Sequence, residues 1–273
     1  KQSIQEKLEA LNKMKKIDEP EVIFEFNPKE FVPEKMVILR QNLYFFNPLS
    51  QNLLTLNEKN ESQLLPIQQS FNSAAILGDS ILFFSKPDKI NVFKNGAIQN
   101  SFTLKLPAPD FNFSKLSALY SNVYLLDSEK GEIIKYASPL EKGKDSPQLW
   151  IAPAETKKAI AGKSMAIDGS VWILQGENVI WRYYRGRFQA ELKLDLFPYP
   201  KNIYKIFTSA SLPYLYLLEP AQNRIIILNK SGEVIKQFQS EKFDNLKDFS
   251  ISENGNTIYL LNGLKVYQIS FVP

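Results

Sequence analysis

The fold is decided by the stretch LYLLEPAQNRIIILNKSGEVIKQF, residues 215–238. Two apolar runs, 215–218 and 225–228, each end in polar residues, and a turn at Gly232 opens a third run that ends at Phe238. Short bursts of β-branched and aromatic residues between Gly, Pro and Asn are typical of antiparallel strands. This stretch therefore predicts a meander of short strands.

The first of these runs belongs to a pattern that returns six times, four apolar residues followed by a polar one. The third residues of the six copies are Tyr44, Leu82, Tyr124, Trp172, Tyr216 and Tyr259. Their steps are 38, 42, 48, 44 and 43 residues, and further apolar strands flank them, such as KMVIL at Lys35, KLSALY at Lys115 and KSMAI at Lys163. Four short antiparallel strands in about 43 residues are the signature of a propeller blade.

The length of the chain decides the number of blades. Residues 21–273 supply six periods of about this length, and a seventh blade would not fit. The last blade lacks a fourth strand, and EVIFEF at 21–26 matches the type of EVIKQF at 233–238 in five of six positions. We therefore expect an all-β, six-bladed β-propeller of four-stranded antiparallel blades over residues 21–273, closed by strand 21–26.

Residues 1–19 have a different pattern. Ile4, Leu8, Leu11 and Met14 recur at helical spacing among charged residues, and Pro20 follows. We predict an N-terminal amphipathic α-helix or linker, which packs on the propeller or follows an upstream module. A self-associating helix or a membrane-surface helix is the alternative.

Composition excludes several kinds of chemistry. The chain has no cysteine and no histidine, so disulfides, thiol nucleophiles, imidazole metal sites and histidine bases are excluded. A net charge of +4 spread along the chain predicts no specific nucleic-acid partner. No apolar run is long enough to span a bilayer, so membrane contact is expected only through a segment upstream of Lys1.

Two segments resemble NHL-type propeller repeats, VYLLDSEKGEIIKY at 123–136 and the opening stretch. In these repeats a strand ends in an acidic residue, Asn-Arg-Ile opens the next strand, and a Gly turn leads to the fourth. The matching residues are Glu219, Asn223, Arg224, Ile225 and Gly232. The resemblance implies a binding or sensor platform for a protein, a peptide or a cell-envelope polymer. From the start at Lys1 and the charged N-terminal helix we expect the terminal domain of a larger, membrane-anchored bacterial protein in an extracytoplasmic place, with a cytoplasmic place as the alternative.

By the same resemblance, the polar residue that ends each second strand would surround the central channel. These residues are Asn47, Ser85, Asp127, Gln175, Glu219 and Asn262. One interpretation is turn chemistry, in which such side chains satisfy free backbone groups at bends. The other is a ligand site, or a calcium site like that of the calcium-dependent lactonases built on six-bladed propellers. We predict no cofactor and no metal site, and calcium is the alternative.

Aromatic residues lie in the segments between blades, several of them beside proline. The candidates are Phe111, Phe113, Phe197 and Tyr199. Aromatic rings on rigid loops make good interface anchors because binding costs them little entropy. The other interpretation is that they fill the spaces between blades.

The stretch WRYYRGRF, residues 181–188, looks like a polyanion-binding patch. It aligns with the bends of VFKNGAI at 92–98 and LNKSGEV at 228–234, which puts Gly186 where a hairpin needs a positive φ. Trp181 and Tyr183 then share one side of a strand, and Arg182 and Tyr184 share the other. We therefore predict a strand bend on the face opposite the polar ring.

Taken together, the sequence predicts a non-catalytic binding, sensor or protein-interaction module. The alternative is a calcium-dependent enzyme that acts on a lactone or a sugar through the polar ring. A scaffold that only organises a larger chain is a third possibility.

Overall fold

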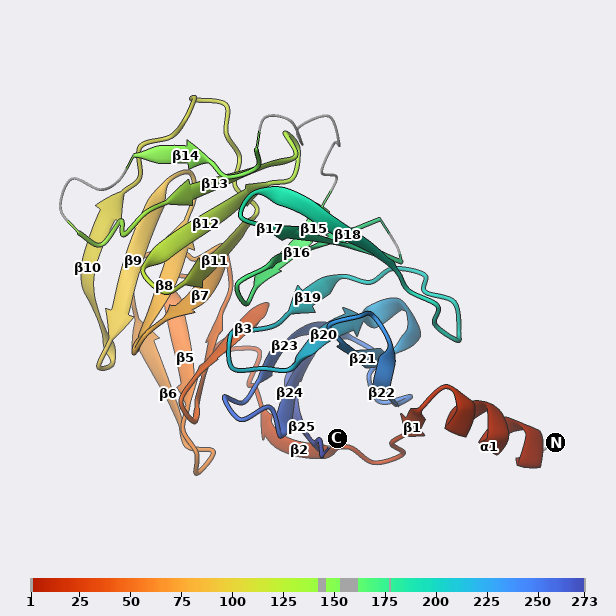
Figure 1. Ribbon diagram of the computed structural model, residues 1–273. Helices are drawn as coiled ribbons and strands as arrows, with labels where there is room; N and C mark the ends of the chain where they lie inside the picture. The colour runs from red at the N-terminus through yellow and green to blue at the C-terminus, as the bar shows by residue number, and fades with distance from the viewer. Residues whose placement is uncertain (1, 142–145, 153–161, 177, 273) are drawn as a thin grey trace.

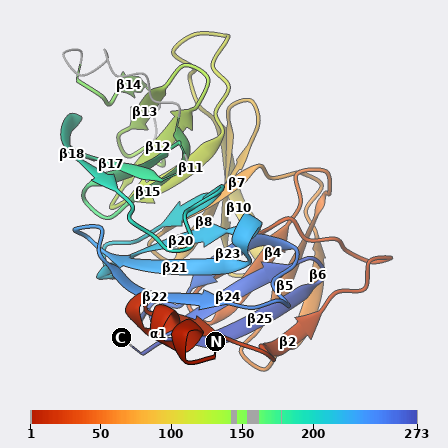
Figure 2. The same cartoon turned by 90° about the vertical axis from the view of Figure 1, so that its right-hand side faces the viewer.

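Six antiparallel sheets surround a central channel in the computed structural model, which describes residues 2–141, 146–152, 162–176 and 178–272 (Figures 1 and 2). The predicted all-β, six-bladed propeller is confirmed. The first strands of neighbouring blades contact one another, so they form the inner wall of the channel. No helix in the described part of the chain is long and apolar enough to cross a membrane.

Blades 1 to 3 follow one another in sequence. Blade 1 consists of β3 (Lys35–Leu39), β4 (Asn42–Phe46), β5 (Asn52–Leu56) and β6 (Ser62–Pro66). Blade 2 consists of β7 (Ser73–Leu77), β8 (Ser80–Ser85), β9 (Lys89–Lys94) and β10 (Ala97–Thr103). Blade 3 consists of β11 (Lys115–Leu119), β12 (Asn122–Asp127), β13 (Glu132–Tyr136) and β14 (Pro147–Leu149).

Blades 4 to 6 complete the circle. Blade 4 consists of β15 (Gly162–Ile167), β16 (Val171–Gln175), β17 (Val179–Tyr184) and β18 (Arg187–Lys193). Blade 5 consists of β19 (Lys205–Phe207), β20 (Tyr214–Glu219), β21 (Arg224–Asn229) and β22 (Val234–Gln239), with the 3₁₀ helix η2 (Pro220–Gln222) after β20. Blade 6 consists of β23 (Leu246–Ile251), β24 (Thr257–Asn262), β25 (Lys265–Ser270) and β2 (Glu21–Glu25).

The N-terminal strand closes the propeller as predicted. β2 pairs antiparallel with β25, in a register that places Glu21 opposite Gln268 and Glu25 opposite Lys265. The amide of Phe26 then donates to the carbonyl of Leu264 at 2.8 Å. Phe26 is buried in the core between blades 6 and 1, so the two ends of the chain share one sheet and one core.

The predicted N-terminal helix is shorter than its apolar spacing indicates. α1 spans Gln2–Leu11, and Met14 belongs instead to β1 (Met14–Lys16), which adds a parallel fifth strand to β22. The outer edge of blade 5 offers unpaired backbone groups, and β1 satisfies them. α1 extends away from the propeller with Ile4 and Leu11 exposed (Figure 1), so its apolar stripe does not pack on the domain.

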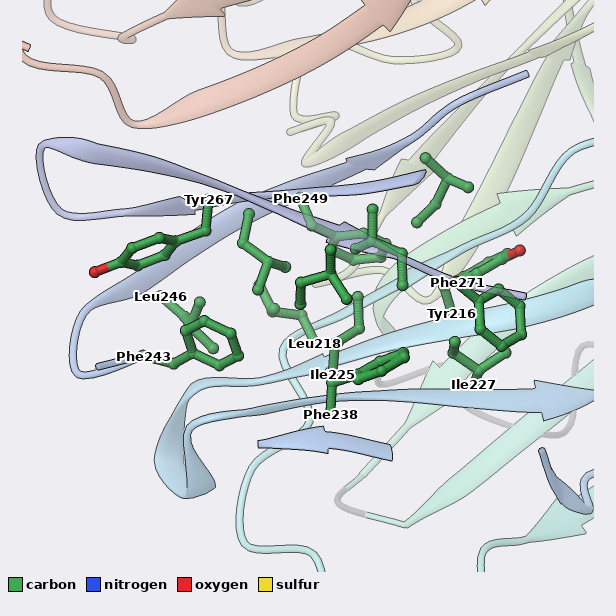
Figure 3. Close-up of a cluster of buried hydrophobic side chains, with 14 of the residues drawn as sticks. Tyr216, Leu218, Ile225, Ile227, Phe238, Phe243, Leu246, Phe249, Tyr267 and Phe271 are labelled. Atoms are coloured by element: carbon green, nitrogen blue, oxygen red, sulfur yellow. The ribbon is translucent and has the colours of Figure 1, made fainter. Parts of the chain in front are cut away.

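The hydrophobic core is divided into clusters that lie between neighbouring blades. In the cluster between blades 5 and 6, Leu218 and Ile225 of one blade face Phe249 of the other (Figure 3). Leu, Ile, Val and aromatic side chains alternate between the two sides of each blade, so every blade contributes to two clusters. Each blade is therefore stabilised by both of its neighbours.

The stretch WRYYRGRF forms the bend between β17 and β18, in agreement with the prediction. Arg185 and Gly186 have φ values of 48° and 75°. A Cβ atom on Gly186 would lie 2.2 Å from the carbonyl oxygen of Trp150, and the amide of Ala152 donates to the Gly186 carbonyl at 2.9 Å. Gly186 therefore serves both the turn and the contact with segment 150–152.

Gly186→Ala and Gly96→Ala form a matched pair that separates these two roles. Gly96 has a φ of 79° in the equivalent bend, but no atom lies within 4 Å of its added Cβ. We expect Gly96→Ala to lower the free energy of unfolding by about 1–2 kcal/mol, the usual cost of a left-handed alanine. Gly186→Ala should cost at least about twice as much because the Trp150 carbonyl must move. Urea denaturation followed by tryptophan fluorescence measures both losses, and equal losses would contradict a tight contact with segment 150–152.

Candidate functional site

The six polar residues that end the second strands lie on one face of the propeller, where the segments between blades also run. We call this side the channel face. Asn47 donates to the carbonyl of Val32 at 2.9 Å, and Ser85 donates to that of Ser70 at 2.6 Å. Asn262 accepts the amide of Asn245 at 2.8 Å. These side chains fasten the strand ends to the preceding loops, which is the turn chemistry described above.

The two acidic residues of this set are also occupied within the protein. Asp127 is buried and accepts the backbone amides of Asn112, Glu129 and Lys130 at 2.8–3.0 Å. Glu219 is buried and accepts from the amide of Lys201 at 2.6 Å. The Oε1 atom of Gln175 is buried without a hydrogen-bond partner in the described part of the chain. None of the six residues lines the channel cavity, so the structure does not bring them together as one site.

Glu219 also forms a fully buried ion pair with Arg224, the residue pair that carries the NHL-type resemblance. Nε of Arg224 donates to Oε2 of Glu219 at 2.6 Å, and both side chains have 0% exposure. The same guanidinium donates to Gln237 at 2.8 Å and to the carbonyl of Pro198 at 2.7 Å. This network joins three strands of blade 5 to the preceding loop.

Arg224→Met tests whether this pair is structural. Removing the cation leaves the Glu219 carboxylate buried without compensation, and we expect the free energy of unfolding to fall by about 3–5 kcal/mol. The double variant Arg224→Met/Glu219→Gln should recover at least half of that loss because no buried charge remains. Urea unfolding at neutral pH measures both variants. A double variant no more stable than the single one would contradict the explanation.

The structure separates the four predicted loop aromatics by their exposure. Phe113 has 1% exposure and packs between blades 2 and 3, so it fills the core and has no surface to offer a partner. Phe111 is partly buried against the same core, with Nζ of Lys130 4.9 Å from its ring centroid. Phe197 and Tyr199 are 52% and 64% exposed. Only the last two have the exposure that an anchor requires.

A different ring of polar side chains lies at the channel, one near the start of each inner strand, and five of its six members line the channel cavity. We call it the channel ring, and it consists of Lys35, Ser73, Lys115, Ser164, Lys205 and Asp248. Each of these residues pairs with the residue just before the polar end of the neighbouring second strand. The ring therefore lies at the same depth in all six blades. Lysines come from blades 1, 3 and 5, and shorter side chains come from blades 2, 4 and 6.

Two β-bulges create this alternation. The inner strands of blades 4 and 6 also have a lysine as their second residue, but Lys163 and Lys247 are the extra residues of bulges. The bulges place Ser164 and Asp248 in the ring instead. Lys163 is exposed, and Lys247 pairs with Glu34 at 2.7 Å. The sequence signal for the ring is the lysine that opens several inner strands, and only the bulges decide which lysines enter the channel.

The shorter ring members tie neighbouring blades together. Ser73 accepts the amide of Leu116 at 3.1 Å, and Ser164 accepts the amide of Ile206 at 3.2 Å. Asp248 accepts the amide of Met36 at 2.9 Å across the junction that closes the propeller. Each bond reaches the residue that follows a ring lysine, which holds the start of each lysine-bearing strand in place.

The three ring lysines have different partners. Lys205 donates to Asp248 and, at 2.8 Å, to the carbonyl of Phe249. Lys35 donates to the carbonyl of Asn72 at 2.6 Å. Lys115 makes no hydrogen bond and no ion pair with the described residues, although its pKa responds to Lys35 and Lys205. The ring therefore contains one lysine whose ammonium group has no acceptor among the described residues.

Two cavities meet at this ring. The channel cavity has a volume of about 520 Å³ and is lined by the inner strands, including the three ring lysines. A second hollow of about 450 Å³ opens on the channel face, and we call it the mouth pocket. It is lined by Glu34, Lys35, Asn47, Pro48, Leu49, Tyr204, Pro220, Leu246 and Lys247. Lys35 lines both cavities, so the mouth pocket borders the ring at this lysine.

Burial has a large effect on Lys115. Desolvation, with a further contribution from the cations of Lys205 and Lys35, lowers its pKa from 10.5 to about 7, and Asp248 offsets only part of this. Lys35 also has a lowered pKa, through burial that Asp248 partly offsets. At neutral pH the Lys115 amine is therefore less fully protonated than an exposed lysine, and negative charge placed beside it would raise its pKa.

The stability of the protein should consequently rise between pH 7 and pH 9. The unfolded chain keeps the Lys115 proton up to about pH 10.5, whereas the folded protein releases it near pH 7. Folding therefore expels a proton in this window, and the free energy of unfolding gains up to about 1.4 kcal/mol per pH unit from this group. Denaturant unfolding at several pH values gives the slope of the free energy of unfolding against pH. This slope should be smaller by that amount in Lys115→Met and unchanged in Lys163→Met. Equal slopes in Lys115→Met and the wild type would contradict the lowered pKa.

The described residues contain no group of three or more acidic side chains that could hold a metal ion, and the chain has no histidine or cysteine. Carboxylates near the channel are engaged, since Asp248 accepts from Met36 and Lys205 and Glu34 pairs with Lys247. The chemistry of the ring is that of hydrogen-bond donors and positive charge, which suits an anion and not a cation.

The geometry is that of a six-bladed β-propeller with a cationic channel, and several solved structures resemble it in fold. A gluconolactonase from Xanthomonas campestris has a TM-score of 0.67 at 8% identity, covering 91% of this chain and 88% of that one. A catalytically inactive histidine-to-alanine variant of virginiamycin B lyase from Staphylococcus aureus, with quinupristin, has a TM-score of 0.58 at 13% identity, covering 87% and 80%. YCF48 bound to D1 peptide has a TM-score of 0.52 at 12% identity, covering 87% and 80%.

At these identities the resemblance shows the fold alone. No protein-family model matches the chain, and no curated protein sequence matches it. The structural neighbours include both enzymes and binding propellers, so the fold is compatible with either kind of function.

Proposed function

We propose that this protein is a non-catalytic binding propeller that holds a segment of a protein or peptide on its channel face. The observation that carries the proposal is the mouth pocket, because exposed apolar side chains surround it. Leu49, which lines it, is 96% exposed beside Pro48, and Tyr204 is 49% exposed. Apolar groups that gather round a pocket on rigid loops are typical of a recognition surface.

The loop that carries Phe197 and Tyr199 extends this surface. The side-chain amide of Gln222 donates to the carbonyl of Tyr199 at 2.7 Å, and Pro220 at the start of the same 3₁₀ helix lines the mouth pocket. Asn178 donates to the hydroxyl of Tyr199 at 2.7 Å. These bonds hold the loop in one conformation before a partner arrives, which lowers the entropic cost of binding.

The enzyme alternative has less support from the residues. The polar residues on which a metal-dependent lactonase was predicted are bonded within the protein, apart from Gln175. The lyase neighbour is inactive when a histidine becomes alanine, and this chain has no histidine. Lactone hydrolysis, favoured by the similarity in fold to a gluconolactonase, is the second candidate function.

A random peptide library displayed on phage, selected on the wild-type protein, tests the binding function. We expect enriched peptides that bind at least tenfold more weakly to Leu49→Ser and to Tyr204→Ala, because each loses an anchor at the mouth pocket. Tyr120→Ala is the matched control, since this exposed tyrosine lies in the turn after β11, at the other end of the inner strands. It should change affinity by less than about twofold.

Either of two results would overturn this function. One is enrichment of peptides that bind both pocket variants as well as the wild type. The other is hydrolysis of gluconolactone above the uncatalysed rate with calcium chloride present, lost in Asp127→Asn or Asn262→Ala, which would favour the enzyme.

A further inference from the structure

The channel ring has more hydrogen-bond donors than the protein uses. Three ammonium groups carry nine N–H donors. Lys35 and Lys205 use three of these donors in the hydrogen bonds that the structure describes, and Lys115 uses none. Asp248, the carboxylate of the ring, is engaged within the protein, because it accepts the amides of Met36 and Phe249 as well as Lys205. With Lys115 protonated, the ring thus has six unused donors.

The placement of the lysines sets the shape of what they could bind. They come from alternate blades, so they surround the channel with approximate threefold symmetry at one depth. Three ammonium groups and one carboxylate give the protonated ring a net charge of +2. A group with three equivalent oxygens and two negative charges matches both the symmetry and the charge, as a phosphate monoester does.

We propose that Lys35, Lys115 and Lys205 together bind a phosphate-type dianion that is part of a larger ligand. This proposal deepens the function proposed above. It rests on that function because the ligand would enter through the mouth pocket. Lys35 lines both cavities, so an anion bound in the ring would be continuous with a ligand on the channel face.

The channel beyond the ring indicates that the rest of the ligand is partly apolar. The next layer of side chains along the inner strands is mostly small and mostly apolar, and it lines the channel cavity. It consists of Val37, Ala75, Ser117, Ala166, Phe207 and Ser250. An inorganic ion would leave this layer uncovered, whereas an apolar substituent on the phosphate would cover it.

Binding should be coupled to protonation of Lys115. The charged groups that act on this amine are Lys205, Asp248 and Lys35, and Lys163 lies on the neighbouring strand with its ammonium 3.3 Å from Asn202. Lys86, Glu34 and Lys247 lie farther out on the channel face, around Lys35. A dianion in the ring adds negative charge beside Lys115 and raises its pKa, so the protein must take up a proton when it binds above pH 7.

Isothermal titration calorimetry with phenyl phosphate and inorganic phosphate tests the site. At pH 8, in two buffers with different heats of ionisation, we expect saturable binding of phenyl phosphate and uptake of close to one proton. Phenyl phosphate should bind at least fivefold more tightly than inorganic phosphate because of the apolar layer. Its affinity should fall by up to tenfold from pH 8 to pH 9, since more of Lys115 must then be protonated by binding.

Lys115→Met should bind phenyl phosphate at least tenfold more weakly and take up no proton. Lys163→Met is the matched control because the bulge in β15 keeps that lysine out of the ring, and it should bind as the wild type does. Equal affinity in Lys115→Met and the wild type would overturn the site, as would the absence of saturable binding. If acetate bound as tightly as phenyl phosphate, the site would not be specific for a dianion. If inorganic phosphate bound as tightly, the proposal that the phosphate belongs to a larger ligand would be wrong.

The calorimetric test and the peptide selection give separate outcomes. If phenyl phosphate binds as expected while no peptide is enriched, the proposed function fails and the anion site stands. If enriched peptides depend on Tyr204 while phenyl phosphate does not bind, the anion site fails and the function stands.

Discussion

The pairing of β2 with β25 is the constraint on which the rest of the structure depends. A propeller stabilises each blade through its two neighbours, so a single open junction would leave two blades with half of their core exposed. The closing junction is covalently distant, since residues 21–25 meet residues 265–268. Phe26 packs in the core there, and Asp248 bonds to Met36 beside the channel. Closure of the ring and the geometry of the channel are therefore set at the same junction.

The character of the channel follows from a local irregularity of the inner strands. A strand alternates its side chains between two faces, so one extra residue moves every following side chain to the other face. The bulges at Lys163 and Lys247 use this rule to keep two lysines out of the ring. Five ring lysines around one channel would repel each other strongly in a region of low dielectric constant. Three lysines and Asp248 leave a net charge that one dianion can neutralise.

The sequence was sufficient for the architecture because the repeat, its length and the closing strand all depend on patterns of period two and about 43 residues. It was not sufficient for the N-terminal segment, where the spacing of Met14 suited a helix but the open edge of blade 5 captured it as a strand. The strand-end residues were identified from the repeat, but none of them lines the channel cavity. The role of these side chains depends on the loop amides that donate hydrogen bonds to them, such as the amides of residues 112, 129 and 130 that donate to Asp127. The spacing of residues in the sequence does not encode those contacts.

The channel lysines illustrate why a binding site can be hidden in a regular fold. Lys115 occupies a position where an apolar residue would be less costly, because the folded protein lowers its pKa to about 7 and the described residues provide it with no acceptor. Lys35 and Lys205 show that the same strand position can be satisfied by a carbonyl or a carboxylate of the next blade. Hydrogen bonds and ion pairs within the fold therefore explain the presence of Lys35 and Lys205 but not that of Lys115. A charged group kept at a cost to stability, beside a cavity and two other cations, is best explained by a ligand that supplies the missing negative charge.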